Sequence, residues 1–180
     1  MTIAAKDSML MIVDYQERLL PAMHDCEALS ERSRILIEGL AILDVPMIIT
    51  QQYTKGLGMS VPFVFAAAGT DVYMDKTEFS AMRNQQIAQT VSSFNKKSVI
   101  VCGIEAHICV LQTCLDLKEQ GFSPILVLDC IGSRKRSEKE MTVIRAQQEG
   151  ITVTSAESLL FELLGEAGGE AFKQISKLIK

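Results

Sequence analysis

The chain has 180 residues, of which 48% are hydrophobic and 22% charged, and its net charge at pH 7 is −4. This length and composition predict one globular domain over residues 1–180 with a sizeable core. A chain with more acidic than basic residues is not expected to have the basic surface that nucleic-acid binding requires. The one cationic cluster, SRKRSEK at 133–139, is flanked by acids and is interpreted as a solvated loop and helix start.

No window approaches the roughly 18 to 20 unbroken apolar residues of a membrane span, and the first residues lead into a strand without a cleavable signal pattern. We therefore expect a cytoplasmic protein with no membrane partner. The five cysteines form no CxxC motif, and their odd number is typical of reduced thiols in such a compartment. No disulfide is predicted.

Short apolar runs rich in Val and Ile predict buried strands at 8–14, 45–51, 98–103, 123–129 and 150–155, with a weaker candidate at 70–75. Helical patterns separate them, at 27–44, 83–94, 107–120, 137–149, 156–164 and from about 168 onward. This alternation predicts right-handed βαβ units and a parallel sheet. The segment 52–71 follows neither pattern, and loops of that length are often functional.

Two residues stand where a parallel sheet binds its ligands, at the carboxyl ends of strands. Asp14 directly follows the first strand, and Cys109 lies near the start of the helix that follows Gly103. On a helical wheel Cys109 is opposite the apolar stripe and shares its face with polar residues, namely Gln112, Thr113 and Asp116. A helix N-terminus also favours a thiolate. These features favour a reactive thiol, and the alternative is a partly buried cysteine without a chemical role.

A catalytic thiol needs a nearby base, or a cation that lowers its pKa. On the predicted helix His107 points about 160° away from Cys109, so a Cys/His pair is not expected. Asp14 is the best-placed carboxylate, although Asp also commonly caps the turn after a strand. Lys76 follows the weak strand, where its charge would favour both an ionised carboxylate and a thiolate. Its alternative is an ordinary solvated lysine.

Four motifs, in this order along the chain, resemble those of the isochorismatase-like cysteine hydrolases: MLMIVDYQERLLPAM, IITQQYTKGLG, DKTEFSAM and VIVCGIEAHICVLQTCLDL. The likeness runs from about residue 8 to the final FKQISKLIK and is greatest to the branch called isochorismatase domain-containing proteins. It implies a three-layer α/β/α fold around a Rossmann-like parallel sheet of about six strands. It also implies that Asp14, Lys76 and Cys109 form a catalytic triad.

The resemblance further implies a cis peptide between Ile104 and Glu105, a bond that costs roughly 3–4 kcal/mol outside proline. The backbone amides of Glu105 and Cys109 would then form an oxyanion hole. The implied activity is hydrolysis of a small amide or related C–N substrate through a thioester, without a cofactor. Substrate-pocket candidates beside the matched motifs are Gln16, as a supporting residue, with Tyr53, Phe79 and His107.

Departures from the family pattern narrow this expectation. TQQYTKGLG contains no histidine, so neither a nicotinamidase nor a bound metal is expected, and Cys109 argues against isochorismate as the substrate. A nucleotide-binding module, a nuclease-like activity and a non-catalytic interaction or scaffold protein stay open as alternatives, although CGIEAH supplies only one glycine of a GxGxxG motif. Family members are often homo-oligomers, and SLLFELLG at 158–165 could furnish an interface.

Overall fold

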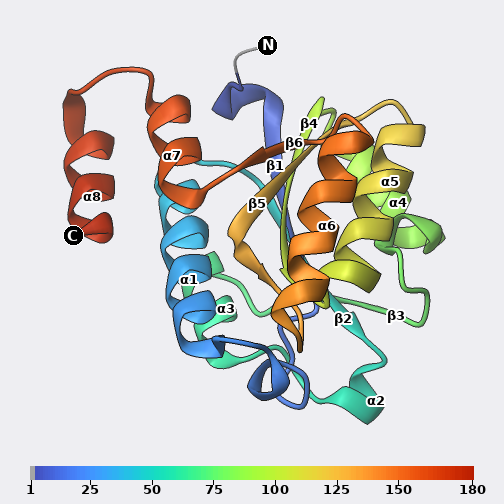
Figure 1. Ribbon diagram of the computed structural model, residues 1–180. Coiled ribbons are helices and arrows are strands. Elements are labelled where there is room, and N and C mark those ends of the chain that lie inside the picture. The colour runs from blue at the N-terminus through green and yellow to red at the C-terminus, as the bar shows by residue number, and fades with distance from the viewer. Residues whose placement is uncertain (1–2) are drawn as a thin grey trace.

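The computed structural model describes residues 3–180 and contains a six-stranded sheet between two layers of helices (Figure 1). The strands are β1 (Ser8–Val13), β2 (Met47–Gln52), β3 (Met74–Lys76), β4 (Ser98–Ile104), β5 (Ser123–Gly132) and β6 (Thr152–Thr154). The helices are α1 (Cys26–Ile42), α2 (Thr54–Leu57), α3 (Pro62–Ala68), α4 (Gln85–Ser93), α5 (Leu111–Glu119), α6 (Arg136–Gln148), α7 (Ala156–Leu164) and α8 (Gly169–Ile179).

The strand order is β3-β2-β1-β4-β5-β6, and every neighbouring pair is parallel. The predicted α/β/α fold with a Rossmann-like sheet of about six strands is therefore confirmed. The chain adds strands on one side of β1 as far as β3 and then returns to place β4 on the other side. Such a reversal opens a crevice at the carboxyl ends of the two central strands, here β1 and β4.

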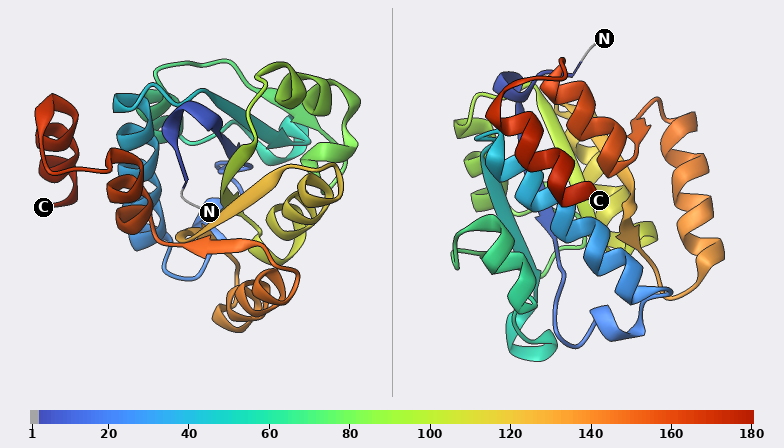
Figure 2. Two further views of the ribbon diagram at one scale, coloured as in Figure 1. Left: turned by 90° about the horizontal axis from the view of Figure 1, so that it is seen from above. Right: turned by 90° about the vertical axis from the view of Figure 1, so that its left-hand side faces the viewer.

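Alternating residues of β1 show how each face of the sheet is covered. Leu10 and Ile12 belong to a core cluster with α1, α3, α7 and α8, whereas Met9, Met11 and Val13 belong to a second cluster with α4, α5 and α6. All five side chains are completely buried. Figure 2 shows the two helical layers on opposite sides of the sheet. A strand buried on both faces explains the unbroken apolar run in the sequence.

The predicted elements differ from the observed ones mainly at their ends. β3 covers only the last part of the weak candidate and extends to Lys76, and β5 runs on to Gly132. The segment 52–71 is no open loop, because it contains the short helices α2 and α3. Both helices start at local signals, a positive φ of 41° at Tyr53 and a proline at the first position of α3.

The apolar segment 158–165 is largely used within the chain. It lies in α7, where Leu159 and Leu160 are completely buried in the core. Phe161 is 39% exposed, and its ring lies 6.3 Å from that of Phe172 in α8. Little apolar surface of α7 is therefore left for another subunit. Among the helices in residues 3–180, none combines the length and apolar character that crossing a bilayer requires.

A glycine is needed at position 103, where β4 passes close to β1. Its partner on β1 is Val13, the residue that precedes Asp14. Gly103 has a φ of 149°. A Cβ at this position would lie 2.4 Å from the Val13 carbonyl oxygen and 2.5 Å from the Val13 Cβ. Any other residue would push the end of β1 away from β4 and displace Asp14 with it.

We predict that Gly103→Ala is destabilised by both a steric clash, typically about 1–3 kcal/mol, and a backbone penalty of about 1–3 kcal/mol. Gly121→Ala is the matched control, because Gly121 also has a positive φ, 88°, but a Cβ there meets no atom within 4 Å. Urea unfolding should show a clearly larger loss for Gly103→Ala. Equal losses in the free energy of unfolding would mean that the close approach of Gly103 to Val13 does not contribute to the destabilisation.

Candidate active site

Asp14 is held at the carboxyl end of β1 by groups from the neighbouring strands. Its side chain is completely buried, and its backbone has a φ of 58°. Thr50 of β2 donates a hydrogen bond to Oδ1 at 2.9 Å, and the Lys76 ammonium lies 2.7 Å from Oδ2. Burial raises the pKa of the Asp14 carboxyl above its usual value of 3.8, although Lys76 and Thr50 act in the opposite direction. Asp14 is therefore a stronger base than an exposed aspartate.

Lys76 is the last residue of β3, and its side chain is completely buried. Besides Asp14, its Nζ approaches the Gln52 Oε1 at 2.6 Å and the carbonyl oxygens of Glu78 and Phe79 at 3.2 and 3.3 Å. An ammonium has three N–H donors, so these acceptors satisfy all of them. Such a lysine is no solvated surface residue, and it fixes the Asp14 carboxylate in one position.

Cys109 lies beside this pair but not as the wheel predicts. A π-helical turn, Ala106–Val110, precedes α5, so the spacing of 100° per residue does not apply to Cys109. The side chain is only 6% exposed and packs in the core cluster with α4 and α5, so the prediction of a polar face is wrong. The negative charge of Asp14 nevertheless raises the pKa of the Cys109 thiol, so the two side chains lie within electrostatic reach of each other. Single π turns inside helices occur often at functional sites.

The start of the helix does not hold Cys109 as a thiolate in the resting protein. Burial raises the pKa of the Cys109 thiol to about 12, and the negative charge of Asp14 adds to this effect more than the positive charge of Lys76 relieves it. The site therefore holds a protonated thiol next to a buried carboxylate of raised pKa. This arrangement can transfer the thiol proton to Asp14 as the sulfur forms a bond, so it needs no standing thiolate.

The predicted cis peptide between Ile104 and Glu105 is absent, because residues 3–180 contain no cis peptide bond. The chain changes direction here with trans bonds, through the φ of 149° at Gly103, a ψ of 109° at Glu105 and the π-helical turn that follows. These angles bring the chain from β4 into α5 without the roughly 3–4 kcal/mol of a cis bond outside proline. The cis bond that was expected to aim the Glu105 amide at an oxyanion is therefore missing, and the oxyanion role of this amide is a prediction that rests on the resemblance alone.

Glu105 has an environment that the sequence analysis does not foresee. Its side chain is nearly buried, and Oε1 lies 2.7 Å from Nε of Arg134. His107 Nδ1 is 3.8 Å from Oε2 and 3.0 Å from the hydroxyl of Ser133. The negative charge of Glu105 contributes to the raised pKa of Cys109, which places Glu105 within electrostatic reach of the thiol. His107 is thus a partner of Ser133 and Glu105.

The other predicted pocket residues divide into one supporting residue and two exposed ones. Gln16 is completely buried, donates to the carbonyls of Gln52 and Gly58 at 3.0 and 2.8 Å, and accepts from the Gln52 amide at 2.7 Å. It thereby fixes the chain around Lys76's partner Gln52. Tyr53 and Phe79 are 51% and 56% exposed. Their backbones, however, contact Lys76, because the Tyr53 amide donates to the Lys76 carbonyl and the Phe79 carbonyl accepts from Nζ.

Sequence reasoning missed three residues that touch the site. Thr50 and Gln52 lie at the carboxyl end of β2, so the rule that singled out Asp14 would also have found them. Arg134 belongs to the cationic cluster that is interpreted as a solvated loop, and no local signal distinguishes it from the neighbouring cations. Its pairing with Glu105 depends on the return of β5 beside β4.

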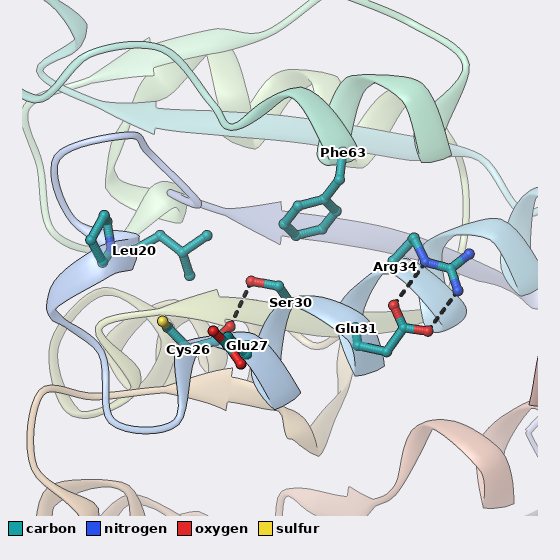
Figure 3. Close-up of a pocket in the computed structure, with 8 residues that line it drawn as sticks. Leu20, Cys26, Glu27, Ser30, Glu31, Arg34 and Phe63 are labelled. Atoms are coloured by element: carbon teal, nitrogen blue, oxygen red, sulfur yellow. Dashed lines mark hydrogen bonds and ion pairs between the residues drawn. The ribbon is translucent and has the colours of Figure 1, made fainter.

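The site is defined by its chemistry and not by the size of a cavity. Figure 3 shows a groove of about 440 Å³ between α1 and α3, lined by residues such as Leu20, Cys26 and Phe63, with Arg34 paired to Glu31. None of the predicted site residues lines this groove. Within residues 3–180, no group of three or more His, Cys, Asp or Glu side chains is arranged to hold a metal ion.

We predict that Lys76→Met is destabilised by about 3–5 kcal/mol at neutral pH, because it leaves the Asp14 carboxylate buried without its partner. The unpaired carboxyl would have a higher folded-state pKa, so the loss should increase as the pH rises above the ordinary carboxyl pKa. Adding Asp14→Asn should restore much of the stability. Urea unfolding measures each variant.

Arg83→Met is the matched control, since Arg83 pairs with Asp116 at 2.8 Å but its side chain is 65% exposed. Exposed pairs contribute about 0–1 kcal/mol. A Lys76→Met loss no larger than the Arg83→Met loss would show that the buried pair is not a strong constraint.

Comparisons with known proteins identify the family of this chain. The isochorismatase domain model matches residues 8–158. The bovine isochorismatase domain-containing protein 2 is 35% identical over 173 residues, which are 96% of this chain and 83% of the relative.

Two solved structures share the fold. The structure described as MAR1 ribonuclease from Caenorhabditis elegans is 34% identical, with a TM-score of 0.91 over 99% of this chain and 92% of its own. The YcaC gene product from Escherichia coli, described as an octameric hydrolase of unknown specificity, is 21% identical, with a TM-score of 0.93 over 98% and 90% of the two chains. The chain therefore belongs to the isochorismatase family, within the branch of the isochorismatase domain-containing proteins, and this membership supports a hydrolase.

Proposed function

We propose that the protein is a cysteine-dependent hydrolase of a small amide or related C–N substrate that acts through a thioester. The observation that carries the proposal is that one buried carboxylate, Asp14, pairs with the Lys76 ammonium and lies near enough to the Cys109 thiol to raise its pKa. A base, a cation and a nucleophile thus lie near the carboxyl ends of β1, β3 and β4, and all three residues are buried.

In the first half of the reaction the Cys109 sulfur attacks the substrate carbonyl carbon while Asp14 takes the thiol proton. The carbonyl electrons move to the oxygen, where the backbone amides of Glu105 and Cys109 are the proposed donors. When the C–N bond breaks, the electrons of that bond go to nitrogen and Asp14 returns the proton to it. The amine leaves, and the acyl group remains on sulfur as a thioester.

In the second half a water molecule attacks the thioester carbonyl and gives a proton to Asp14. The C–S bond then breaks, the sulfur takes the proton back from Asp14, and the carboxylic acid leaves. Lys76 keeps Asp14 oriented throughout, and its charge stabilises the carboxylate form that each proton transfer needs. The cycle ends with the protonated thiol that burial favours at the start.

A ribonuclease is the second candidate, because the 34% identical relative from Caenorhabditis elegans is described as one. The net charge of −4 offers little attraction for a polyanion, and Lys76 is buried and occupied by Asp14. Salt-dependent RNA binding and cleavage that persist in Cys109→Ala would favour this candidate over the amide hydrolase. A folded wild-type protein that neither hydrolyses amides nor cleaves RNA would favour a scaffold role.

A homo-oligomer stays part of the proposal. The Escherichia coli fold neighbour is described as octameric. In this chain several large apolar side chains are exposed close together in the sequence around β3, namely Val72, Tyr73 and Phe79. A second copy would cover apolar surface there more readily than on α7, whose Leu159 and Leu160 are already buried.

We predict that Asp14→Asn lowers turnover by about 100- to 10,000-fold, the usual contribution of a general base. The same substitution should lower the pKa of the Cys109 thiol from about 12, because the negative charge of Asp14 raises that pKa. Ammonia release from a panel of small amides and carbamoyl compounds, with ultraviolet titration of the thiolate, measures the two effects. A more acidic thiol in a less active enzyme identifies Asp14 as the proton acceptor.

Asp75→Asn is the control, because Asp75 precedes Lys76 but is exposed and does not influence the thiol. Cys109→Ala should reduce turnover to background while the protein stays folded. Full turnover in either Asp14→Asn or Cys109→Ala would contradict the proposed function.

A further inference from the structure

Two cysteines that the proposed reaction does not use lie on neighbouring strands. Cys102 belongs to β4 and Cys130 to β5, and both side chains are completely buried. Both belong to the core cluster that includes α1, so their side chains project from the same face of the sheet. A single buried thiol is ordinarily a small apolar packing group. Two thiols on one face of adjacent strands can instead react with each other.

The pairing of the two strands brings these cysteines opposite each other. Gly103 pairs with Ile131 after a shift in register that adds residues to β5. One position earlier in this register, Cys102 lies opposite Cys130, whereas without the shift it would lie opposite Val127. Neighbouring strands are about 4.8 Å apart, and disulfides join Cα atoms separated by roughly 4.4–6.8 Å. The spacing of the strands therefore suits a bond between the two sulfurs.

A buried tyrosine shows independently that the two thiols share one environment. The Tyr15 hydroxyl donates a hydrogen bond to the Cys130 carbonyl and lies 2.6 Å from the hydroxyl of Ser33 in α1. Burial raises the pKa of Tyr15, and the charges of Cys102 and Cys130 add to this effect. Burial likewise raises the pKa of Cys130, with further contributions from Asp129 and Cys102. Both thiols thus lie within electrostatic reach of one hydroxyl and of each other.

We propose that Cys102 and Cys130 are a disulfide-forming site, a redox-sensitive link between β4 and β5 on the face of the sheet that α1 covers. Both thiols are reduced in this structure. With hydrogen peroxide as the oxidant, one sulfur attacks a peroxide oxygen and the O–O bond breaks, which gives a sulfenic acid and one water molecule. The other sulfur then attacks the sulfenic sulfur, the S–S bond forms and a second water molecule leaves. Each sulfur loses one electron, and the peroxide gains two.

Burial determines when this link can form. It raises the pKa of Cys102 to about 12, so the thiol stays protonated and reacts slowly while the core is closed. An oxidant reaches the pair only when α1 separates locally from the sheet. The site therefore responds to oxidation combined with loosening of this layer. Because Cys102 directly precedes Gly103, the link would fix β4 where it passes β1.

The test maps disulfides in the wild-type protein after treatment with hydrogen peroxide, with and without urea below the unfolding transition. Catalase stops the oxidation, iodoacetamide blocks the free thiols in denaturant, and trypsin digests the protein without reduction. The expected product joins peptide 98–118 to peptide 119–134, which contains Cys130 alone. Fragmentation identifies Cys102 among the three cysteines of the first peptide. We expect this product to form severalfold faster in the urea and to disappear on reduction.

Three alanine variants separate the pair from other buried thiols. Cys102→Ala and Cys130→Ala should each abolish the product. Cys114→Ala is the matched control and should keep it. Cys114 is also completely buried, and burial also raises its pKa to about 12, but it lies in the core cluster on the other face of the sheet. The linked wild type should unfold at a higher urea concentration than the reduced protein, because the link restricts the unfolded chain.

Circular dichroism shows which variants are folded, and the wild-type map decides the question if an alanine variant is not. A wild type that forms no link between Cys102 and Cys130, or forms it only above the unfolding transition, would overturn the inference. A link from either residue to another cysteine would do the same. A linked protein that unfolds at a lower urea concentration would show that the native strands do not accommodate the bond. None of these outcomes depends on amide turnover.

Discussion

A buried ion pair between Asp14 and Lys76 joins the carboxyl ends of β1 and β3, and Gln52 and Thr50 of the intervening strand complete it. Removing two charges from water is unfavourable, and a buried pair is often no more stable than apolar residues of the same size. Here every polar atom of the pair has a partner, which makes its position well defined. The pair is better explained by the chemistry that it allows at Cys109 than by its contribution to stability.

The same burial that defines the pair also determines the state of the nucleophile. It raises the pKa of both Asp14 and Cys109, so the proton stays on sulfur until a substrate arrives. A buried protonated thiol is protected from indiscriminate alkylation and oxidation, since the thiolate is the reactive form. Activation is then coupled to substrate attack, and the cost of a standing thiolate is avoided.

The fold and the candidate site could be predicted from the sequence for different reasons. Apolar runs buried on both faces are unambiguous, so the sheet and its helices follow from periodicity. Asp14 and Lys76 were singled out because each stands at the end of a strand, whereas their assignment with Cys109 to one triad depended on the resemblance. The polar face expected for Cys109 was wrong because a π-helical turn changes the direction of each side chain, and burial outweighs the effect of the helix dipole on the thiol. Arg134 reaches Glu105 only through the pairing of β4 with β5, which no local pattern encodes.

Trapping the thioester is the most direct test of whether Asp14, Lys76 and Cys109 act together in covalent catalysis. Rapid quenching of the protein with an amide that it turns over, followed by mass spectrometry, should reveal a transient acyl group on Cys109. Asp14→Asn should form this adduct at least about 100-fold more slowly, because the substitution removes the general base. Amide turnover without an adduct, at equal rates in the wild type and Cys109→Ala, would show that Cys109 is not a covalent nucleophile.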